Sequence, residues 1–319
     1  MRRTLLANSS AIVRSLLRAF EVEPEHARLS DRYGVPANRI AIGNGSCDIL
    51  LAAGDALLEP GAEVVYAWPS FSVYPHLAAA SGATAIEVPL DAEHKHDLSR
   101  MREEITVATR LVVVCNPNNP TSTALPLEEI AAFVRAVPRH VAVILDEAYC
   151  EYSTLDDPDA TLDLLDNHSN LVLLRTFSKV YGLAGLRVGF GLCGSEDFVG
   201  AVNQVRQPFF VNVAAQAAAV EALKHGDAVV ERVERAVVAR IHIEEGLAAM
   251  GMQVADSQAN FVWFDLPEDV DEPEIVRSLK ERDIIVRAGG SLGRPGALRV
   301  SFGPQSHNQR FLDALGELL

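Results

Sequence analysis

The segment from Thr176 to Gly189 contains the residues whose types and spacing point most directly to chemistry. It reads Thr-Phe-Ser-Lys-Val-Tyr-Gly-Leu-Ala-Gly-Leu-Arg-Val-Gly and follows an apolar run. Its glycines permit tight turns and a close approach of the backbone to a ligand. Ser178 and Arg187 can donate hydrogen bonds to a phosphate, for which the forked guanidinium is well shaped. Lys179 lies between them, and a lysine beside a phosphate site is what a Schiff-base cofactor requires. The alternative is a surface lysine with a structural arginine, which leaves the rest of the run unexplained.

A second candidate is Asp146, which directly follows an apolar run and lies three residues before Tyr149. In open α/β sheets ligands bind at the carboxyl ends of strands, where this acid is expected. A carboxylate there can keep a pyridine nitrogen protonated and so make the ring an electron sink. Tyr149 could donate a hydrogen bond to a ring oxygen. For Asp146 taken alone, a helix N-cap is an equal alternative.

Three further segments follow predicted strands. Residues 116–121, Asn-Pro-Asn-Asn-Pro-Thr, form a rigid turn whose amides can donate to a ligand oxygen, or a turn without a ligand. Residues 43–48 precede a predicted helix, and small residues there expose backbone N–H groups to an anion. They lack the P-loop lysine and the G-x-G-x-x-G spacing, so they are weak as a nucleotide motif. Phe71, within residues 69–74, either stacks on a planar cofactor or packs in the core.

These residues must be positioned by strands that alternate with helices along the first two thirds of the chain. The alternation favours an α/β fold with a mainly parallel sheet. Several runs are β-branched without alternation, as expected of strands that are covered on both faces. The predicted strands are residues 40–42, 63–66, 85–88, 111–114, 141–145, 171–174 and 187–191.

The pattern changes near residue 227, where apolar residues recur at helical spacing to about residue 250. Shorter predicted elements follow: a strand over 260–264, a helix over 273–282, strands over 284–287 and 298–302, and a last helix to 319. We therefore predict a large domain over residues 1–226 and a small α+β domain over 227–319. The chain begins with a predicted amphipathic helix over about residues 1–20, expected to pack on the small domain.

The composition excludes several classes of protein. Of 319 residues, 28 are Lys or Arg and 43 are Asp or Glu, giving a net charge of −15. This balance argues against nucleic acid or an anionic membrane as a partner. No apolar run approaches the roughly 20 residues of a membrane span. The four cysteines are widely spaced without a C-x-x-C pair, so we expect reduced thiols, no metal site and a cytoplasmic protein.

The segments above, in this order, resemble the fold-type I pyridoxal-phosphate enzymes, specifically the class I and II aminotransferases. Within them the sequence is most similar to the histidinol-phosphate aminotransferase group. The run Ser-Lys-x-x-Gly-Leu-x-Gly-x-Arg-x-Gly is highly specific, the other segments moderately so. The matching segments cover nearly the whole chain from about residue 30: 43–46, 69–74, 116–121, 146–149, 178–189, 259–261 and 298–303.

The resemblance implies a role for each matching residue. Lys179 would carry pyridoxal 5′-phosphate as a Schiff base and, once freed by substrate, move the α-proton. Asp146 would pair with the pyridinium nitrogen, and Phe71 would stack on the ring. Tyr149 and Asn119 would bond the phenolic oxygen. The residues implied around the phosphate are Gly45, Ser46, Cys47, Ser178 and Arg187.

Two arginines match substrate-side positions of the family. Arg299 matches the arginine that commonly receives the substrate carboxylate. Arg287, twelve residues earlier, matches a second arginine of the histidinol-phosphate group. A surface ion pair, which contributes little energy, is the alternative for Arg287.

The sequence departs from the family at residue 122 and before residue 43. The family usually reads Asn-Pro-Thr-Gly, whereas Ser122 follows Thr121 here. A serine is expected only if the backbone there does not require a positive φ. The family's Asn-Glu-Asn-Pro-Tyr and Arg-Tyr-Pro phrases, which line the substrate site and reach the neighbouring subunit's phosphate, have no counterpart here.

The expected function is transfer of an amino group between an anionic amino acid or amino-phosphate and a 2-oxo acid, by a homodimer. Another pyridoxal-phosphate reaction (decarboxylase, lyase or amine oxidase) is an alternative, because the cofactor-holding residues are shared. A catalytically silent ligand-binding homologue is another. The missing dinucleotide motif argues against a nucleotide-dependent dehydrogenase.

Overall fold

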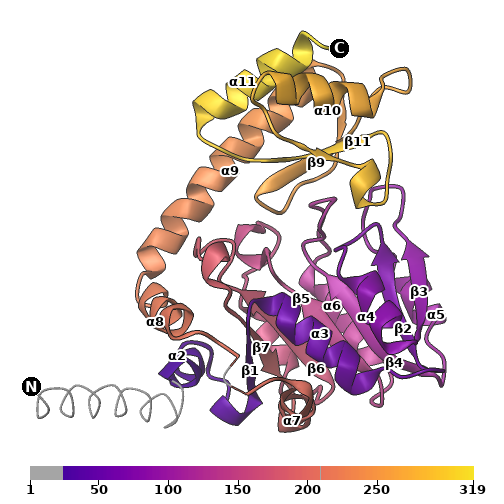
Figure 1. Ribbon diagram of the computed structural model, residues 1–319, viewed down its shortest axis with the longest axis vertical. Helices are drawn as coiled ribbons and strands as arrows, with labels where there is room; N and C mark the ends of the chain where they lie inside the picture. Colours follow the sequence, from indigo (N-terminus) through magenta and orange to yellow (C-terminus); the bar gives the residue numbers. More distant parts are fainter. Residues whose placement is uncertain (1–23, 209) are drawn as a thin grey trace, which may run out of the picture.

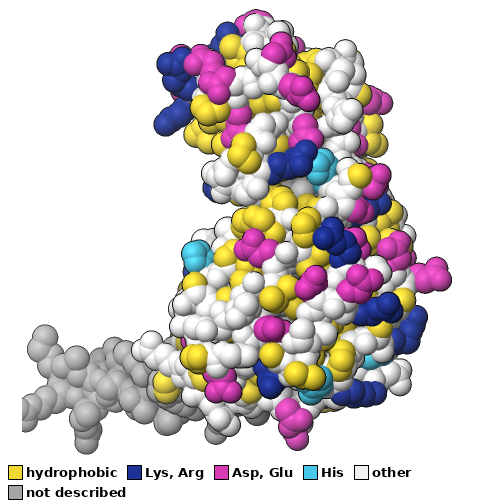
Figure 2. All heavy atoms as spheres, turned by 90° about the vertical axis from the view of Figure 1, so that its right-hand side faces the viewer, with side chains coloured by type: hydrophobic (Ala, Val, Ile, Leu, Met, Phe, Trp, Pro, Cys, Tyr) yellow, Lys and Arg dark blue, Asp and Glu magenta, His cyan; other side chains and the backbone are white. Residues whose placement is uncertain are grey.

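The computed structural model describes residues 24–208 and 210–319. The helix predicted over about residues 1–20 lies outside the described residues. Figure 1 shows two sheets, one in the lower and one in the upper part of the molecule, joined along one side by the long helix α9 (Gly226–Ala249). Figure 2 shows the same division as two lobes that meet at a narrower waist.

The lower sheet has seven strands in the order β1-β7-β6-β5-β4-β2-β3. Adjacent strands from β6 to β3 run parallel, and β7 is antiparallel to both of its neighbours. The predicted mainly parallel α/β fold is therefore confirmed, together with its seven strands. Their bounds are β1 Ile40–Gly43, β2 Glu63–Trp68, β3 Thr84–Pro89, β4 Thr109–Cys115, β5 Ala142–Asp146, β6 Leu171–Thr176 and β7 Gly189–Cys193.

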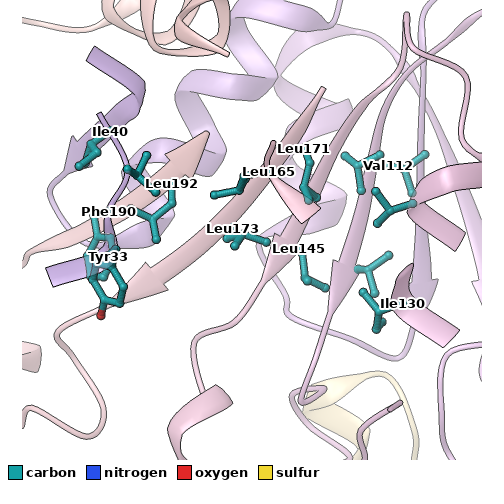
Figure 3. Packing of buried hydrophobic residues seen from close by; sticks show 14 of the residues in the cluster. Tyr33, Ile40, Val112, Ile130, Leu145, Leu165, Leu171, Leu173, Phe190 and Leu192 are labelled. Carbon is teal, nitrogen blue, oxygen red and sulfur yellow. The ribbon is translucent and has the colours of Figure 1, made fainter. Parts of the chain in front are cut away.

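Helices cover both faces of this sheet. One core cluster joins alternate strand residues such as Val112 and Leu145 to α2, α5, α6 and α8, and Figure 3 shows part of it. The residues between them, such as Val113 and Ile144, pack with α3, α4 and α7. Burial on both faces explains why these strands are apolar without alternation. The helix bounds are α2 Pro24–Tyr33, α3 Ser46–Leu57, α4 Tyr74–Ser81, α5 Leu98–Glu103, α6 Leu127–Ala136, α7 Glu196–Val205 and α8 Val213–Ala222.

The upper sheet is antiparallel, in the order β10-β11-β9-β8, and packs against two helices and the end of α9. The elements are β8 Gln253–Val254, β9 Phe261–Asp265, α10 Glu272–Glu281, β10 Arg287–Ala288, β11 Ala297–Ser301 and α11 Gln305–Gly316. Short 3-10 helices occur at Ala37–Arg39, Cys150–Tyr152, Ala160–Leu164, Ala184–Leu186 and Gly290–Leu292. The domain boundary at residues 226 and 227 stays a prediction, and it falls at the start of α9.

Two predicted strands begin later than the sequence suggests. The strand predicted over 284–287 is wrong before Arg287, because the Ile284 N–H donates to Leu279 O and closes the end of α10. The strand predicted over 187–191 begins only at Gly189, since Arg187 has a left-handed backbone with φ of 63°. Among the helices of the described residues, none is long and apolar enough to cross a membrane.

Candidate active site

The site begins where three neighbouring parallel strands end. Strands β4, β5 and β6 finish at Cys115, Asp146 and Thr176, and Cys115 lies opposite Asp146 in the register. The loops that follow these strands therefore emerge at one edge of the sheet. They contain the three segments around Asn119, Tyr149 and Lys179, so sequence segments far apart in the chain meet at this edge.

Asp146 is 2% exposed at the end of β5. Burial raises the pKa of its carboxyl to about 6, while hydrogen bonds from the Tyr74 hydroxyl and the Ala148 N–H and the charge of Lys179 oppose that rise. No α-helix starts after Asp146, since a turn at residues 148–149 leads into the 3-10 helix Cys150–Tyr152, so Asp146 is not the N-cap of an α-helix. The carboxyl group is a buried acid that gains from a cationic partner.

Tyr74 is a site residue that the sequence analysis missed. Its hydroxyl donates to Asp146 Oδ2 at 2.9 Å, and its side chain is fully buried in α4. The signal available in the sequence was its position three residues after Phe71, since Phe71 lies just before α4 and Tyr74 is the first residue of that helix. Asn118 was likewise missed: its Oδ1 accepts from Ser70 Oγ at 2.7 Å and lies 3.1 Å from His96 Nε2. Its Nδ2 donates to Thr121 Oγ1, so Asn118 holds the loop rather than a ligand.

Lys179 lies in the loop after β6, with Nζ 4.9 Å from the centroid of the Tyr149 ring. Burial lowers the pKa of its amine, and the positive charge of Arg299 lowers it further, while the Asp146 carboxylate acts in the opposite direction. A lysine with a lowered pKa carries more of the neutral, nucleophilic amine at neutral pH. Lys179 is therefore suited to attack a carbonyl carbon or to accept a proton.

Gly45 and Arg187 form a cradle at the start of α3. Gly45 is the N-cap residue with φ of 78°, and a Cβ there would collide with the Arg187 guanidinium. Gly189 lies so close to the start of α3 that a Cβ added to it would collide with the backbone N of Ser46. These approaches bring the first N–H groups of α3, including those of Ser46 and Cys47, next to Arg187. Backbone N–H groups at a helix start and a guanidinium together can bind a phosphate.

The remaining residues predicted around the phosphate have less distinctive contacts. The Ser178 N–H donates to Thr176 Oγ1 at 3.1 Å, which fixes the turn before Lys179. Burial raises the pKa of the Cys47 thiol, so this cysteine is a weakly reactive neighbour rather than a thiolate. Phe71 is partly buried, and its ring meets that of Tyr74 edge-on at 5.7 Å. A stacking role for Phe71 stays a prediction.

The upper sheet supplies a second wall. Arg299 Nη1 donates to Asn119 Oδ1 at 2.6 Å, across the waist, and its guanidinium lies 4.9 Å from the centroid of the Phe261 ring. Phe261 in turn meets Tyr149 edge-on at 5.1 Å. Within the described residues Arg299 Nε is buried without a hydrogen-bond partner. Because a buried guanidinium N–H without a partner is costly, this donor points to an anionic ligand.

Arg287 stands directly opposite Arg299 in the β10–β11 pair. Its side chain is exposed, and it forms no ion pair with a carboxylate in the described part of the chain. Within residues 24–208 and 210–319 the surface ion pair considered as the alternative is therefore not observed. Like charges directly opposite each other in a sheet repel, so an anion between them would be stabilising.

The expectation for Ser122 is wrong. Its φ is 61°, so the backbone does require a left-handed conformation, and serine occupies it. The Ser122 N–H donates to Asn118 O at 2.8 Å, and its carbonyl accepts from the Gln258 N–H at 2.7 Å. The side chain is fully buried, and its hydroxyl donates to the neighbouring carbonyl of Thr121. These contacts hold the strained residue in place.

Comparison with known proteins identifies the family of the chain. The family model "Aminotransferase class I and II" matches residues 25–315. The chain belongs to this aminotransferase family. The aminotransferase is 45% identical to an aromatic amino acid aminotransferase of Thermobifida fusca, over 90% of its own length and 77% of the relative's. It is 46% identical to histidinol-phosphate aminotransferase 1 of Thiobacillus denitrificans, over 92% and 75%.

A solved structure with the same fold as this chain has a cofactor bound. The histidinol-phosphate aminotransferase of Sinorhizobium meliloti in complex with pyridoxal-5′-phosphate superposes with a TM-score of 0.83. It is 27% identical, and the alignment covers 93% of the present chain and 81% of that one. The aminotransferase uses pyridoxal phosphate. The buried acid Asp146, the lysine with a lowered pKa and the anion cradle at Gly45 fit this group, which carries a pyridine nitrogen, an aldehyde and a phosphate.

Proposed function

We propose that the aminotransferase acts on an anionic amino donor, an amino-phosphate or an anionic amino acid, with a 2-oxo acid as acceptor. The observation that carries this proposal is the pair Arg287 and Arg299, which stand opposite each other, with Arg299 Nε buried and without a hydrogen-bond partner among the described residues. Two guanidinium groups on neighbouring strands, opposite each other, suit a phosphate or a carboxylate, which they can bind through several N–H groups. Relatives named histidinol-phosphate aminotransferase at up to 46% identity support the amino-phosphate.

The cofactor residues take the following roles in this proposal. Asp146 pairs with the ring nitrogen, and Tyr74 keeps the Asp146 carboxylate ionised by donating to it. Asn119 accepts from Arg299 through Oδ1, which leaves its Nδ2 to donate to the phenolic oxygen beside Tyr149. Phe71 covers the ring. The phosphate is held by Gly45, Ser46, Cys47, Ser178 and Arg187.

Pyridoxal phosphate supplies an aldehyde that joins to amines and a ring that accepts electrons. Lys179 would hold the cofactor through its Nζ, and its lowered pKa favours the neutral amine that is needed both to hold the cofactor and to accept a proton. Once released, Lys179 Nζ would be the base that accepts the proton from the donor's α-carbon and the acid that gives it back. Asp146 keeps the proton on the ring nitrogen throughout. Arg299 and Arg287 orient the donor, so that its α-hydrogen faces Lys179.

Aromatic amino acids form a second candidate class of donor. A relative that is 45% identical is named aromatic amino acid aminotransferase, and Phe261 with Tyr149 offers an aromatic wall beside Arg299. Such a donor would use Arg299 for its carboxylate and leave Arg287 without a role.

The two candidates separate in a single-turnover assay of the purified holoenzyme. Histidinol phosphate, histidinol and phenylalanine are compared as donors, with wild type and Arg287→Gln. The proposal predicts a clear preference for histidinol phosphate over histidinol, and a loss of about 10- to 100-fold in that preference in the variant. Equal turnover of histidinol and its phosphate, with faster turnover of phenylalanine, would instead support the aromatic donor.

We propose further that the aminotransferase is a homodimer, as the family resemblance implies, and that it is cytoplasmic, as its cysteine usage suggests. The four cysteines are free, which agrees with a reducing compartment. Light scattering is expected to give twice the 34.5 kDa mass of the chain. A mass of one chain at assay concentrations would contradict the dimer.

A further inference from the structure

The loop between β10 and β11 determines where the two arginines stand. This loop, residues 289–296, directly follows the strand pair in which Arg287 lies opposite Arg299 and Ala288 opposite Leu298. Because like charges opposite each other repel, the pair does not hold itself together. The backbone pairing of β10 with β11, which a bond from the Gly289 N–H to Ala297 O extends, sets the register of the two arginines, and the loop and its anchors hold this short strand pair in place.

A single carboxylate spans this loop. Glu272 is the first residue of α10 and is only 7% exposed. It accepts hydrogen bonds from the Gly290 N–H at 3.0 Å and the Gly296 N–H at 2.5 Å, near the two ends of the loop. The start of a helix stabilises a negative charge, so α10 supports the carboxylate that receives both bonds.

The tip of the loop is fixed by packing. Leu292 is buried in a small cluster with Trp263. Trp263 lies on β9, where it is the ladder partner of Arg299. Gly293 has φ of 98°, and a Cβ there would lie 2.8 Å from the indole of Trp68 at the end of β2. The loop thus contacts the lower sheet at its tip and Glu272 at its base, and Arg287 lies on the short strand that leads into it.

We propose that Glu272 is a positioning residue for the arginine pair, which it sets by holding both ends of the β10–β11 loop. The inference rests on the proposed role of Arg287 and Arg299 in binding the donor's anionic group. Glu272 itself does not touch the substrate. Loss of one of its hydrogen bonds releases the loop at one end, and Arg287 then moves away from its place opposite Arg299.

Glu272→Gln tests this role with little change in shape. The amide keeps one acceptor oxygen, but its NH₂ group meets a backbone N–H where the carboxylate accepted. We expect KM for histidinol phosphate to rise about tenfold, with kcat and the kcat/KM for histidinol changed less than twofold. Glu274→Gln is the matched control, because Glu274 lies on the same helix, is exposed and pairs with Arg277 away from the loop. Glu272→Asp, which keeps the charge on a shorter side chain, replaces the glutamine variant if that one does not fold.

A double substitution shows whether Glu272 acts through Arg287. If it does, Glu272→Gln adds nothing further to the KM of Arg287→Gln, because both changes remove one interaction. Additive effects, or an equal loss with histidinol and histidinol phosphate, would overturn the inference and leave Glu272 a purely structural residue. Failure of the proposed function is a separate result, in which Arg287→Gln alone leaves the donor preference unchanged.

Discussion

Replacing Tyr74 by phenylalanine removes one hydroxyl and keeps the buried ring. That hydroxyl donates to Asp146 Oδ2 at 2.9 Å. A hydrogen bond to a charged group contributes about 1.5–3 kcal/mol, and 1.36 kcal/mol corresponds to one pKa unit. Since the pKa of Asp146 is about 6 with the bond in place, its loss should raise that pKa to roughly 7–8.

The consequence is a pH-dependent loss of cofactor affinity. Asp146 must be ionised to pair with the protonated ring nitrogen, and protonation of Asp146 competes with binding below its pKa. At pH 6.5 the ionised fraction should fall roughly 3- to 25-fold in Tyr74→Phe, whereas at pH 9 both proteins are ionised. Titration of the apoprotein with pyridoxal phosphate, followed by absorbance at both pH values, measures this difference.

Tyr66→Phe is a matched control. Tyr66 is also fully buried, its ring lies 6.0 Å from that of Tyr74, and its hydroxyl donates to Glu87 rather than to the site. It should leave the pH dependence of cofactor binding unchanged. A Tyr74→Phe variant that loses the same affinity at pH 6.5 and pH 9 would refute the reasoning, because Tyr74 would then act through packing alone.

Three further predictions concern stability and the cofactor's phosphate. The folded-state pKa of Asp146 is raised from 3.8 to about 6, so the stabilisation from its proton is complete below pH 3.8 and is lost as pH rises through 6. At pH 7.5 the ionised carboxylate therefore lowers the stability of the folded apoprotein by about 3 kcal/mol. The apo form of Asp146→Asn should have a higher Tm than wild type, and the variant should lose transamination. A lower Tm would contradict this cost. Because Ser122 has φ of 61°, Ser122→Gly should be about 1 kcal/mol more stable than Ser122→Ala in urea unfolding, and equal stabilities would show that the left-handed backbone is not retained. Gly45→Ala should displace the Arg187 guanidinium and weaken pyridoxal phosphate binding about tenfold, with binding of pyridoxal, which lacks the phosphate, unaffected; an equal loss for both would place the phosphate elsewhere.

The sequence predicts the large sheet well because its strands are long apolar runs buried on both faces. All seven predicted strands form, and their carboxyl ends place Asn119, Asp146 and Lys179 at one edge. Local pattern fails where the backbone is set by tertiary contacts. Arg187 is β-like in sequence, but it adopts φ of 63° beside Gly45, and the apolar residues after α10 are used to end that helix.

The contacts that complete the site join residues far apart in the chain. Tyr74 reaches Asp146 over 72 residues, and Arg299 reaches Asn119 over 180 residues from the other sheet. No local spacing predicts such pairs, because they depend on how the two sheets pack. Ser122 is the opposite case: serine was expected only with a backbone that needs no positive φ, and this expectation failed because hydrogen bonds with Asn118 and Gln258 hold the serine at φ of 61°.

The most direct test of the proposed site is the attachment point of the cofactor. The chain has only four lysines, namely Lys95, Lys179, Lys224 and Lys280. Borohydride reduction of the holoenzyme, followed by peptide mass spectrometry, identifies the lysine that carries pyridoxal phosphate. We predict modification of Lys179, its absence in Lys179→Ala, and protection of Lys179 when glutamate converts the cofactor to its amine form before reduction. Modification of one of the other three lysines, or full retention of transamination by Lys179→Ala, would contradict the account.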